Sequence, residues 1–326
     1  MTDVDSLLEQ VRERLRTPAS CGVDAVDRLV ADALRPGKLL RPELVLRSAE
    51  ATRGDLDPDR SVAHRAVEGA LAVELLHVAT LVHDDIIDAA DLRRGRPSVV
   101  AAAGPATAIV VGDLLLARGA AAAARSSTAA SAAWARTLGC MASGQLREAG
   151  LVASPSLEGH AEYASLKTAE LFRASAEIGA LAAGSVSDVV EAHGAFGLHV
   201  GRAYQHLDDL LDVVGDPRRM GKPVGADASN GIPTAVSLRS DHDWLEDVVG
   251  LVVVELGKAR AALPPGPAST LLGAWATSAL CRAALAAVDV GDRRLAHRLT
   301  AAFSRLEPVS EPRPQELQPW RTTPSA

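Results

Sequence analysis

The amino-acid sequence predicts an all-α fold, and three observations support this prediction. Hydrophobic residues make up 48% of the 326 residues but aromatic residues only 3%, so Ala, Leu and Val have to build the core. Uninterrupted alanine, as at residues 120–124, favours a helix, because strands are usually rich in Val, Ile and aromatic residues. Apolar residues recur with helical spacing along nearly the whole chain, and no convincing strand pattern interrupts them.

The expected helices are separated by clusters of Gly, Pro and Asp, which break the helical pattern. Gly54 and Gly215 stand where helices are expected to end, and Asp243 with Glu246 three residues later forms a capping-box pattern at a helix start. In chain order, helices are expected at residues 3–16, 23–34, 39–53, 60–89, 105–124, 127–150, 157–183, 187–215, 232–239, 243–262, 268–287 and 291–306.

A single domain is expected over residues 1–306, because no linker or change of composition divides them. Residues 307–326 hold five prolines among polar residues. This composition is typical of segments that cannot bury enough apolar surface to fold, so a disordered tail is expected there.

Charge and cysteine content disfavour several classes of function. A net charge of −7 and a pI near 5.7 provide no basic surface for nucleic acid. The N-terminus lacks the basic and apolar segments of a signal peptide, and the most apolar stretch, residues 106–124, contains charged residues and is interpreted as a buried helix rather than a membrane span. The cysteines are too far apart for a metal motif or a disulfide framework, which favours the cytoplasm; they are Cys21, Cys140 and Cys281.

The strongest functional signal is an acidic cluster at residues 83–88, with the sequence His-Asp-Asp-Ile-Ile-Asp. On a helix, Asp84 and Asp88 lie one turn apart on the same face, whereas Asp85 points about 100° away. The preceding residues 72–82 are largely apolar and are expected to be buried. Carboxylates that end a buried helix repel one another unless a cation joins them, although a single cluster is equally compatible with a solvated helix end.

A second cluster with the same spacing follows about 120 residues later, at Asp208, Asp209 and Asp212. Two such clusters facing each other supply hard oxygen ligands, which suit Mg²⁺, an ion that keeps water ligands and bridges to substrate phosphates. Two copies in apolar surroundings, each followed by basic residues, favour a functional site over solvated helix ends. The expected third component is a diphosphate.

Lysine is scarce, since only four of the 34 basic residues are Lys. Three of the four lie in the segments PGKLLRP, LKTAELF and MGKP, at Lys38, Lys167 and Lys222. A lysine ammonium can contact a phosphate oxygen from many directions, while the arginine guanidinium is a planar fork. These three positions are therefore predicted to bind diphosphate.

The ordered set of motifs resembles the trans-polyprenyl diphosphate synthases, the head-to-tail prenyltransferases of isoprenoid biosynthesis. The resemblance implies a single all-α bundle around a deep central cavity, usually as a homodimer. It covers about residues 35–240. The matching segments are GKxxRP at 37–42, the first aspartate-rich motif with RRG at 93–95, GD at 112–113, KTA at 167–169, YQ at 204–205 before the second aspartate-rich motif, and GKP at 221–223 with Gly225 and Asp227.

The resemblance also implies roles for individual residues in a condensation of isopentenyl diphosphate with an allylic diphosphate. Three Mg²⁺ ions would be held by Asp84, Asp85, Asp88, Asp208, Asp209 and Asp212. The implied catalytic residues are Asp84, Asp88, Asp208, Lys167 and Lys222. The allylic diphosphate would contact Arg93, Lys167, Gln205 and Lys222, with Thr168 in the same binding set. Isopentenyl diphosphate would contact Gly37, Lys38, Arg41, His77 and Arg94.

Small residues at Ala79 and Thr80 resemble the long-chain members, with products of about 30 to 50 carbons, because short-chain members have bulky aromatic side chains there. A synthase of products with 15 or 20 carbons stays open, as does a terpene cyclase on the same scaffold. Cyclases usually shield cations with aromatic faces, which are scarce here. A non-catalytic regulatory subunit is a further alternative, although such subunits typically lose an aspartate motif. One departure is Ile232, where the family often has Lys.

Overall fold

The computed structural model describes residues 3–53, 60–216, 219, 225, 231–238, 244–288, 298–301 and 303. One short hairpin, β1 (Leu92–Arg93) with β2 (Arg96–Pro97), lies between α4 and α5, and the other elements are helical. They are α1 (Val4–Arg16), α2 (Asp24–Ala33), α3 (Leu40–Arg53), α4 (Arg60–Ile87), α5 (Val99–Ser126), α6 (Thr128–Ala153), α7 (Leu157–Ala164), the π turn η1 (Ser165–Ala169), α8 (Glu170–Ala182), α9 (Ser187–Val214), α12 (Trp244–Ala262) and α13 (Pro267–Ala287). The all-α prediction is confirmed.

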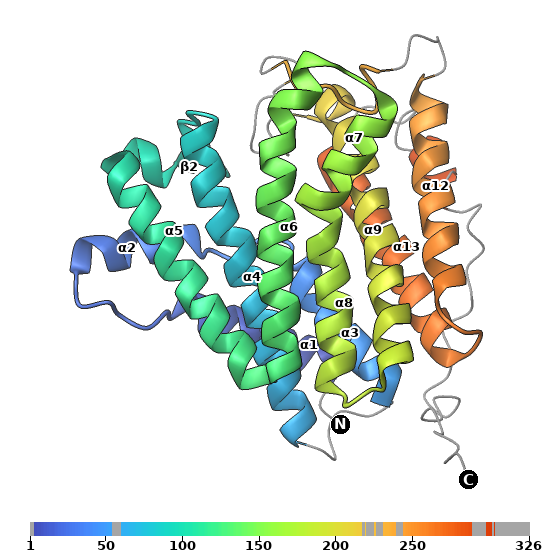
Figure 1. Ribbon diagram of the computed structural model, residues 1–326, viewed down its shortest axis with the longest axis horizontal. Coiled ribbons are helices and arrows are strands. Elements are labelled where there is room, and N and C mark those ends of the chain that lie inside the picture. The colour runs from blue at the N-terminus through green and yellow to red at the C-terminus, as the bar shows by residue number, and fades with distance from the viewer. Residues whose placement is uncertain are drawn as a thin grey trace.

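The long helices form a bundle in which α6, α8, α9 and α12 stand beside one another, with α4 and α5 at the side of α6 (Figure 1). Helix α4 packs against α5, α8 against α9, and α9 against α12. The close approach of α9 depends on Gly197 and Gly201, where an added Cβ would lie 2.4 Å from the carbonyl oxygen of Phe172 and 2.5 Å from Cα of Ala169. This packing holds the second aspartate-rich motif against the π turn.

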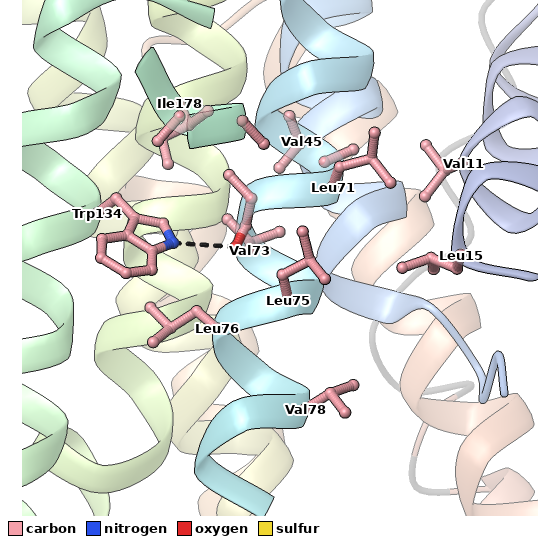
Figure 2. Packing of buried hydrophobic residues seen from close by; sticks show 14 of the residues in the cluster. Val11, Leu15, Val45, Leu71, Val73, Leu75, Leu76, Val78, Trp134 and Ile178 are labelled. Atoms are coloured by element: carbon pink, nitrogen blue, oxygen red, sulfur yellow. Dashed lines mark hydrogen bonds between the residues drawn. The ribbon is translucent and has the colours of Figure 1, made fainter. Parts of the chain in front are cut away.

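In the described part of the chain, the core contains two hydrophobic clusters, one around α4 and one between α9, α12 and α13. Figure 2 shows the first, where Val11 and Leu15 of α1 lie on one side of α4 and Trp134 of α6 lies on the other. The Trp134 indole N–H donates a hydrogen bond of 2.9 Å to the carbonyl oxygen of Ala72. Contacts on several sides fix the position of α4, and therefore of the acidic cluster at its C-terminal end.

Two helix boundaries differ from the prediction for local reasons. The helix expected at 157–183 is divided into α7, the π turn and α8, because a π turn adds one residue to a helical turn while the chain stays helical. The helix expected from 105 begins at Val99. It is kinked at Gly104, which has a φ of 79° and directly precedes Pro105.

The helix expected at 232–239 is wrong, since the described residues 231–238 form turns. Thr234 and Ser237 each accept a hydrogen bond from the other's backbone N–H, at 3.1 and 2.8 Å, a competition with helix that is usual for hydroxyl side chains. Most of the helix expected at 291–306, and the expected tail at 307–326, lie outside the described residues. The described residues 298–301 and 303 are helical.

Among the residues that the structure describes, three helical segments are long and apolar enough to cross a membrane, judged by length and composition alone: Ser61–Ile87, Val99–Ser126 and Pro267–Ala287. The most apolar window of Ser61–Ile87 is 78% buried within the protein, whereas the most apolar window of Val99–Ser126 is only 22% buried. The interpretation of residues 106–124 as a buried helix is therefore wrong. Helix α5 lies at the edge of the bundle, so most of its apolar surface faces away from the core (Figure 1).

Candidate active site

The first aspartate-rich segment lies where α4 ends. Asp84 is in the last turn of the helix, and Asp88 follows the helix with its backbone N–H bonded to the carbonyl oxygen of Asp84 at 2.8 Å. Burial raises the pKa of Asp84 to about 6, while Lys167 opposes this shift and Asp88 adds to it. Burial also raises the pKa of Asp88. Two crowded carboxylates of this kind are stabilised in their charged form by a cation.

Lys167 approaches these carboxylates from the π turn. Its Nζ donates a hydrogen bond of 2.8 Å to Oε2 of Glu148, and the Tyr163 hydroxyl donates one of 2.6 Å to the same oxygen. Gln145 Nε2 donates to the other oxygen of Glu148 at 3.0 Å. Burial alone would raise the pKa of Glu148, but its bonds to Lys167 and Tyr163 outweigh this and lower it. Sequence reasoning missed Glu148.

Asp85 points away from Asp84 and Asp88, as helical geometry predicts. Its Oδ1 accepts hydrogen bonds from Nε and Nη2 of Arg93 at 2.9 and 2.5 Å, and the residue is only 2% exposed. The hairpin presents Arg93 through a tight turn at Arg94 and Gly95, whose φ angles of 53° and 73° suit a type I′ turn. Magnesium ligation by Asp85 therefore stays a prediction, and Oδ1 of this carboxylate is already bonded to Arg93.

A cavity of about 490 Å³ lies between the start of α3, α4, the hairpin, α9 and α13. Most predicted substrate-binding residues line it: Gly37, Lys38, Arg41, His77, Arg93, Arg94, Thr168 and Gln205, together with Asp208. Asp84, Asp88 and Lys167 do not line this cavity but form the separate group described above. Ala79 and Thr80 line neither this cavity nor a second one of about 680 Å³ beyond the hairpin. Lys222 lies outside the described residues.

The guanidinium group of Arg41 in the cavity contacts two aromatic rings and a histidine. Its guanidinium carbon lies 4.6 Å from the ring centroid of Phe172 and 5.9 Å from that of Tyr204, and its Nη1 is 3.3 Å from Nε2 of His77. Burial, together with nearby arginine charges, lowers the pKa of His77 well below its usual value, so the neutral ring can accept this bond. Glu74, which the sequence reasoning missed, also lines the cavity, and burial raises its pKa. A glutamate within an apolar helical run was the available signal.

Lys38 lies near Asp208 in the cavity. Desolvation lowers the pKa of Lys38, and the charge of Asp208 opposes this shift. The next residue, Leu39, has a φ of 52°, and Ala89 and Arg94 have 48° and 53°. Such a conformation costs a non-glycine residue about 1–3 kcal/mol and is typical of functional sites. All three strained residues adjoin or belong to the predicted site.

Asp209 is only 1% exposed, and its carboxylate is occupied by protein donors. It accepts hydrogen bonds from Nε2 of Gln205 at 2.8 Å and from the backbone N–H of Ala235 at 2.8 Å, and Nε2 of His160 lies 3.0 Å away. Burial alone would raise the pKa of Asp209, but these partners, His160 foremost, hold it below its usual value. Ligation by Asp209 stays a prediction. Sequence reasoning missed His160, because no spacing relates it to the aspartates.

The donor set fits Mg²⁺ that is held jointly with a diphosphate. In the described part of the chain, no group of three or more His, Cys, Asp or Glu side chains could hold a metal ion alone. Magnesium, however, usually takes one or two protein carboxylates and completes its octahedron with water and phosphate oxygens. Asp84 and Asp88 on one side, and Asp208 in the cavity, can supply ligands of this kind.

Comparison with known proteins extends this picture. A family model described as Polyprenyl synthetase matches residues 24–243. The (2E,6E)-farnesyl diphosphate synthase of Mycobacterium tuberculosis is 38% identical over 199 residues, which are 59% of this chain and 53% of that protein, so the chain spans about half the length of this relative. The octaprenyl diphosphate synthase of Escherichia coli is 30% identical over 234 residues, 70% of each chain.

Among solved structures, the polyprenyl synthase of Caulobacter crescentus, which is complexed with calcium and isoprenyl diphosphate, has the same fold with a TM-score of 0.66. It is 27% identical, and the match covers 92% of this chain and 94% of that one. The family model, the relatives and the fold agree, and the chain belongs to the polyprenyl synthetase family.

Proposed function

We propose that the chain is a Mg²⁺-dependent trans-polyprenyl diphosphate synthase, which joins isopentenyl diphosphate to an allylic diphosphate. One observation carries this proposal above the others. A single cavity gathers the basic residues Lys38, Arg41 and Arg94 with Asp208 and Gln205 of the second aspartate-rich segment. Such a cavity can hold one diphosphate on its basic side and bring its carbon end close to an allylic diphosphate bound at Asp208, so that the reaction between them becomes effectively intramolecular.

Isopentenyl diphosphate binds to the basic side of the cavity in this proposal. Arg41 is held by Phe172 and His77, and Nη1 of Arg94 donates a hydrogen bond of 2.7 Å to the carbonyl oxygen of Arg35. Fixed guanidinium groups bind a diphosphate with little further loss of side-chain entropy.

The allylic diphosphate binds between the two aspartate-rich segments. Mg²⁺ held by Asp84, Asp88 and Asp208 would supply positive charge that stabilises the departing diphosphate. Lys167 exchanges Glu148 for a diphosphate oxygen. The C–O bond of the allylic substrate breaks with both electrons leaving on diphosphate, and the double bond of isopentenyl diphosphate supplies the pair for the new C–C bond before a proton is lost.

The proposed product is long, with about 30 to 50 carbons. The relatives include both a farnesyl and an octaprenyl diphosphate synthase, so their names do not choose a length. The choice rests on this chain's own residues at the end of α4. Ala79 is a completely buried methyl group, and the Thr80 hydroxyl donates to the carbonyl oxygen of His77 at 2.9 Å. Neither side chain is large enough to block a growing chain.

The active form is proposed to be a cytoplasmic homodimer that covers α5 with a second copy. The outer face of α5 carries small exposed residues, among them Ala106, Ala117 and Ala120, which allow close helix packing. The side chain of Asp113, in the middle of α5, is 66% exposed, and a lipid-facing charge at such a position is costly. Light scattering should show a dimer that Ala120→Arg dissociates, whereas Ala261→Arg on the exposed face of α12 leaves it intact.

The decisive test of the function is product analysis. Purified protein is incubated with Mg²⁺, labelled isopentenyl diphosphate and farnesyl or geranylgeranyl diphosphate, and the products are sized by chromatography. Label is expected in prenyl diphosphates longer than the primer, and chelation of Mg²⁺ or Asp208→Asn should abolish it. A wild-type protein that moves no label into a longer chain contradicts the proposed function, and a cyclic hydrocarbon product supports a cyclase instead.

A further inference from the structure

The short helix α7 presents two ring side chains to the site from outside the motifs. The Tyr163 hydroxyl bonds to Glu148, the partner of Lys167, and His160 lies against Asp209 in the second aspartate-rich segment. The centroids of the His160 and Tyr163 rings are 6.5 Å apart. Helix α7 therefore contacts the supports of both diphosphate-binding groups.

The contact between His160 and Asp209 is buried and geometrically complete. Their side chains are only 3% and 1% exposed, and Nε2 of His160 lies 3.0 Å from Oδ2 of Asp209. The same oxygen accepts the backbone N–H of Ala235, and the other oxygen accepts Nε2 of Gln205. A buried carboxylate with donors on both oxygens acts as an anchor, and here Oδ2 has two donors while Oδ1 has one.

Asp209 in turn fixes the orientation of side chains that line the cavity. The amide of Gln205 is held at both ends, because its Nε2 donates to Asp209 at 2.8 Å and its Oε1 accepts the Thr168 hydroxyl at 2.7 Å. Gln205 and Thr168 both line the cavity, and Thr168 follows Lys167 in the π turn. A continuous chain of hydrogen bonds thus runs from α7 through α9 to the π turn.

We propose that His160 is a positioning residue of the diphosphate site, which holds Asp209 so that Asp209 orients Gln205 and Thr168 instead of binding metal. This inference rests on the proposed function. A residue that merely filled the space of His160 would present carbon to a buried carboxylate and would leave it one donor short. Asp209 could then rotate, and the amide of Gln205 would lose its fixed orientation.

The test compares His160→Leu with His160→Gln. Leucine fills the space without a donor, whereas the glutamine amide restores an N–H near the position of Nε2. Loss of an outer-shell support typically costs about 10–100-fold in affinity or activity, so we expect His160→Leu to weaken binding of inorganic diphosphate with Mn²⁺ by that factor in calorimetry and to lower kcat. His160→Gln should stay within about threefold of wild type, because its donor is retained.

Two further variants make the comparison independent of folding. His199→Leu on α9 is the matched control, since His199 pairs with Glu255 at 2.7 Å and lines no part of the cavity; it should leave diphosphate binding unchanged. If His160→Leu does not fold, Asp209→Asn replaces it, because this change preserves size and removes the acceptor charge; it should weaken diphosphate binding to the same extent.

The outcomes separate the two proposals. Unchanged diphosphate affinity and kcat in His160→Leu would contradict the positioning role, and so would equal losses in the Leu and Gln variants, which would indicate packing alone. A wild-type protein that binds diphosphate but forms no longer prenyl chain contradicts the proposed function, while the calorimetric comparison still decides the role of His160.

Discussion

The guanidinium group of Arg41 lies over the ring of Phe172, with 4.6 Å between its central carbon and the ring centroid. Phe172 is completely buried and is one of only three phenylalanines in the chain. A partly desolvated cation over an aromatic face gains about 1–2 kcal/mol. In this Ala-rich core, a scarce aromatic side chain is thus placed where it holds a cation of the cavity.

Phe172→Leu should weaken the use of isopentenyl diphosphate. Loss of the contact leaves Arg41 free to leave its position, and 1–2 kcal/mol corresponds to a rise in KM for isopentenyl diphosphate of about 5–30-fold. Steady-state kinetics with each substrate varied in turn measure this change. Phe196→Leu is the matched control, since Phe196 is also completely buried, while the ring contacts of Arg41 are with Phe172 and Tyr204; an equal rise in KM there would refute the role of Phe172.

Lys38 and Lys167 should affect different substrates. Lys38 lies near Asp208 in the basic cavity, while Lys167 lies beside Asp84 and Asp88. Removal of a charged hydrogen-bond donor costs about 1.5–3 kcal/mol, or roughly 10–150-fold. Lys38→Met should raise KM mainly for isopentenyl diphosphate, and Lys167→Met mainly for the allylic diphosphate. Lys258→Met, which breaks only a pair with Glu255 on α12, should change neither value; identical profiles for Lys38→Met and Lys167→Met would contradict the assignment.

Asp84→Asn should stabilise the metal-free protein at high pH. Burial raises the pKa of Asp84 from 3.8 to about 6, so the folded protein holds its proton more tightly than the unfolded chain. The resulting cost is absent below about pH 3, grows as pH rises, and is complete above about pH 6, at about 1–2 kcal/mol after allowance for partial exposure. Urea unfolding in a chelator at pH 8 and at pH 4 measures the difference.

In that experiment, the variant should be more stable than wild type at pH 8, and the difference should fall to less than about 0.5 kcal/mol at pH 4. Asp188→Asn, at an exposed position in the first turn of α9, is the control and should change stability by less than about 0.5 kcal/mol at either pH. Addition of Mg²⁺ with inorganic diphosphate should reverse the order at pH 8, because only wild type gains the binding energy. A variant less stable than wild type at pH 8 without metal would be inconsistent with the raised pKa.

The aspartate clusters illustrate how far the sequence leads and where tertiary packing decides. Helical spacing correctly separated Asp85 from Asp84, because directions around a helix depend only on residue number. The partner of Asp85 comes from a hairpin, and that of Asp209 from α7 and the turn at Ala235. No local pattern connects these segments, so the sequence could not show that both carboxylates have hydrogen-bond donors from elsewhere in the protein.

Helix α5 shows a second limit. Its apolar run predicted a helix correctly, but apolar spacing does not distinguish a core from another covering surface. Only the arrangement of the bundle places α5 at the edge (Figure 1). The prediction of a helix at 232–239 was wrong for a different reason. The hydroxyl groups of Thr234 and Ser237 form hydrogen bonds with the backbone that compete with a helix.

Ala79→Tyr should shorten the product. Ala79 is buried on α4, five residues before Asp84. If the growing prenyl chain runs along α4 as proposed, a tyrosine ring at this position takes up part of its path. Overpacking a core position typically costs about 1–3 kcal/mol, so Thr80→Phe, at a less buried position one residue later, provides an independent version of the same block. Chromatography of the dephosphorylated products should show a shift to shorter chains in both variants, with kcat for the first condensation retained. Thr80→Val, which preserves size, should leave the length unchanged, and wild-type product length in both bulky variants would contradict the proposed path of the chain along α4.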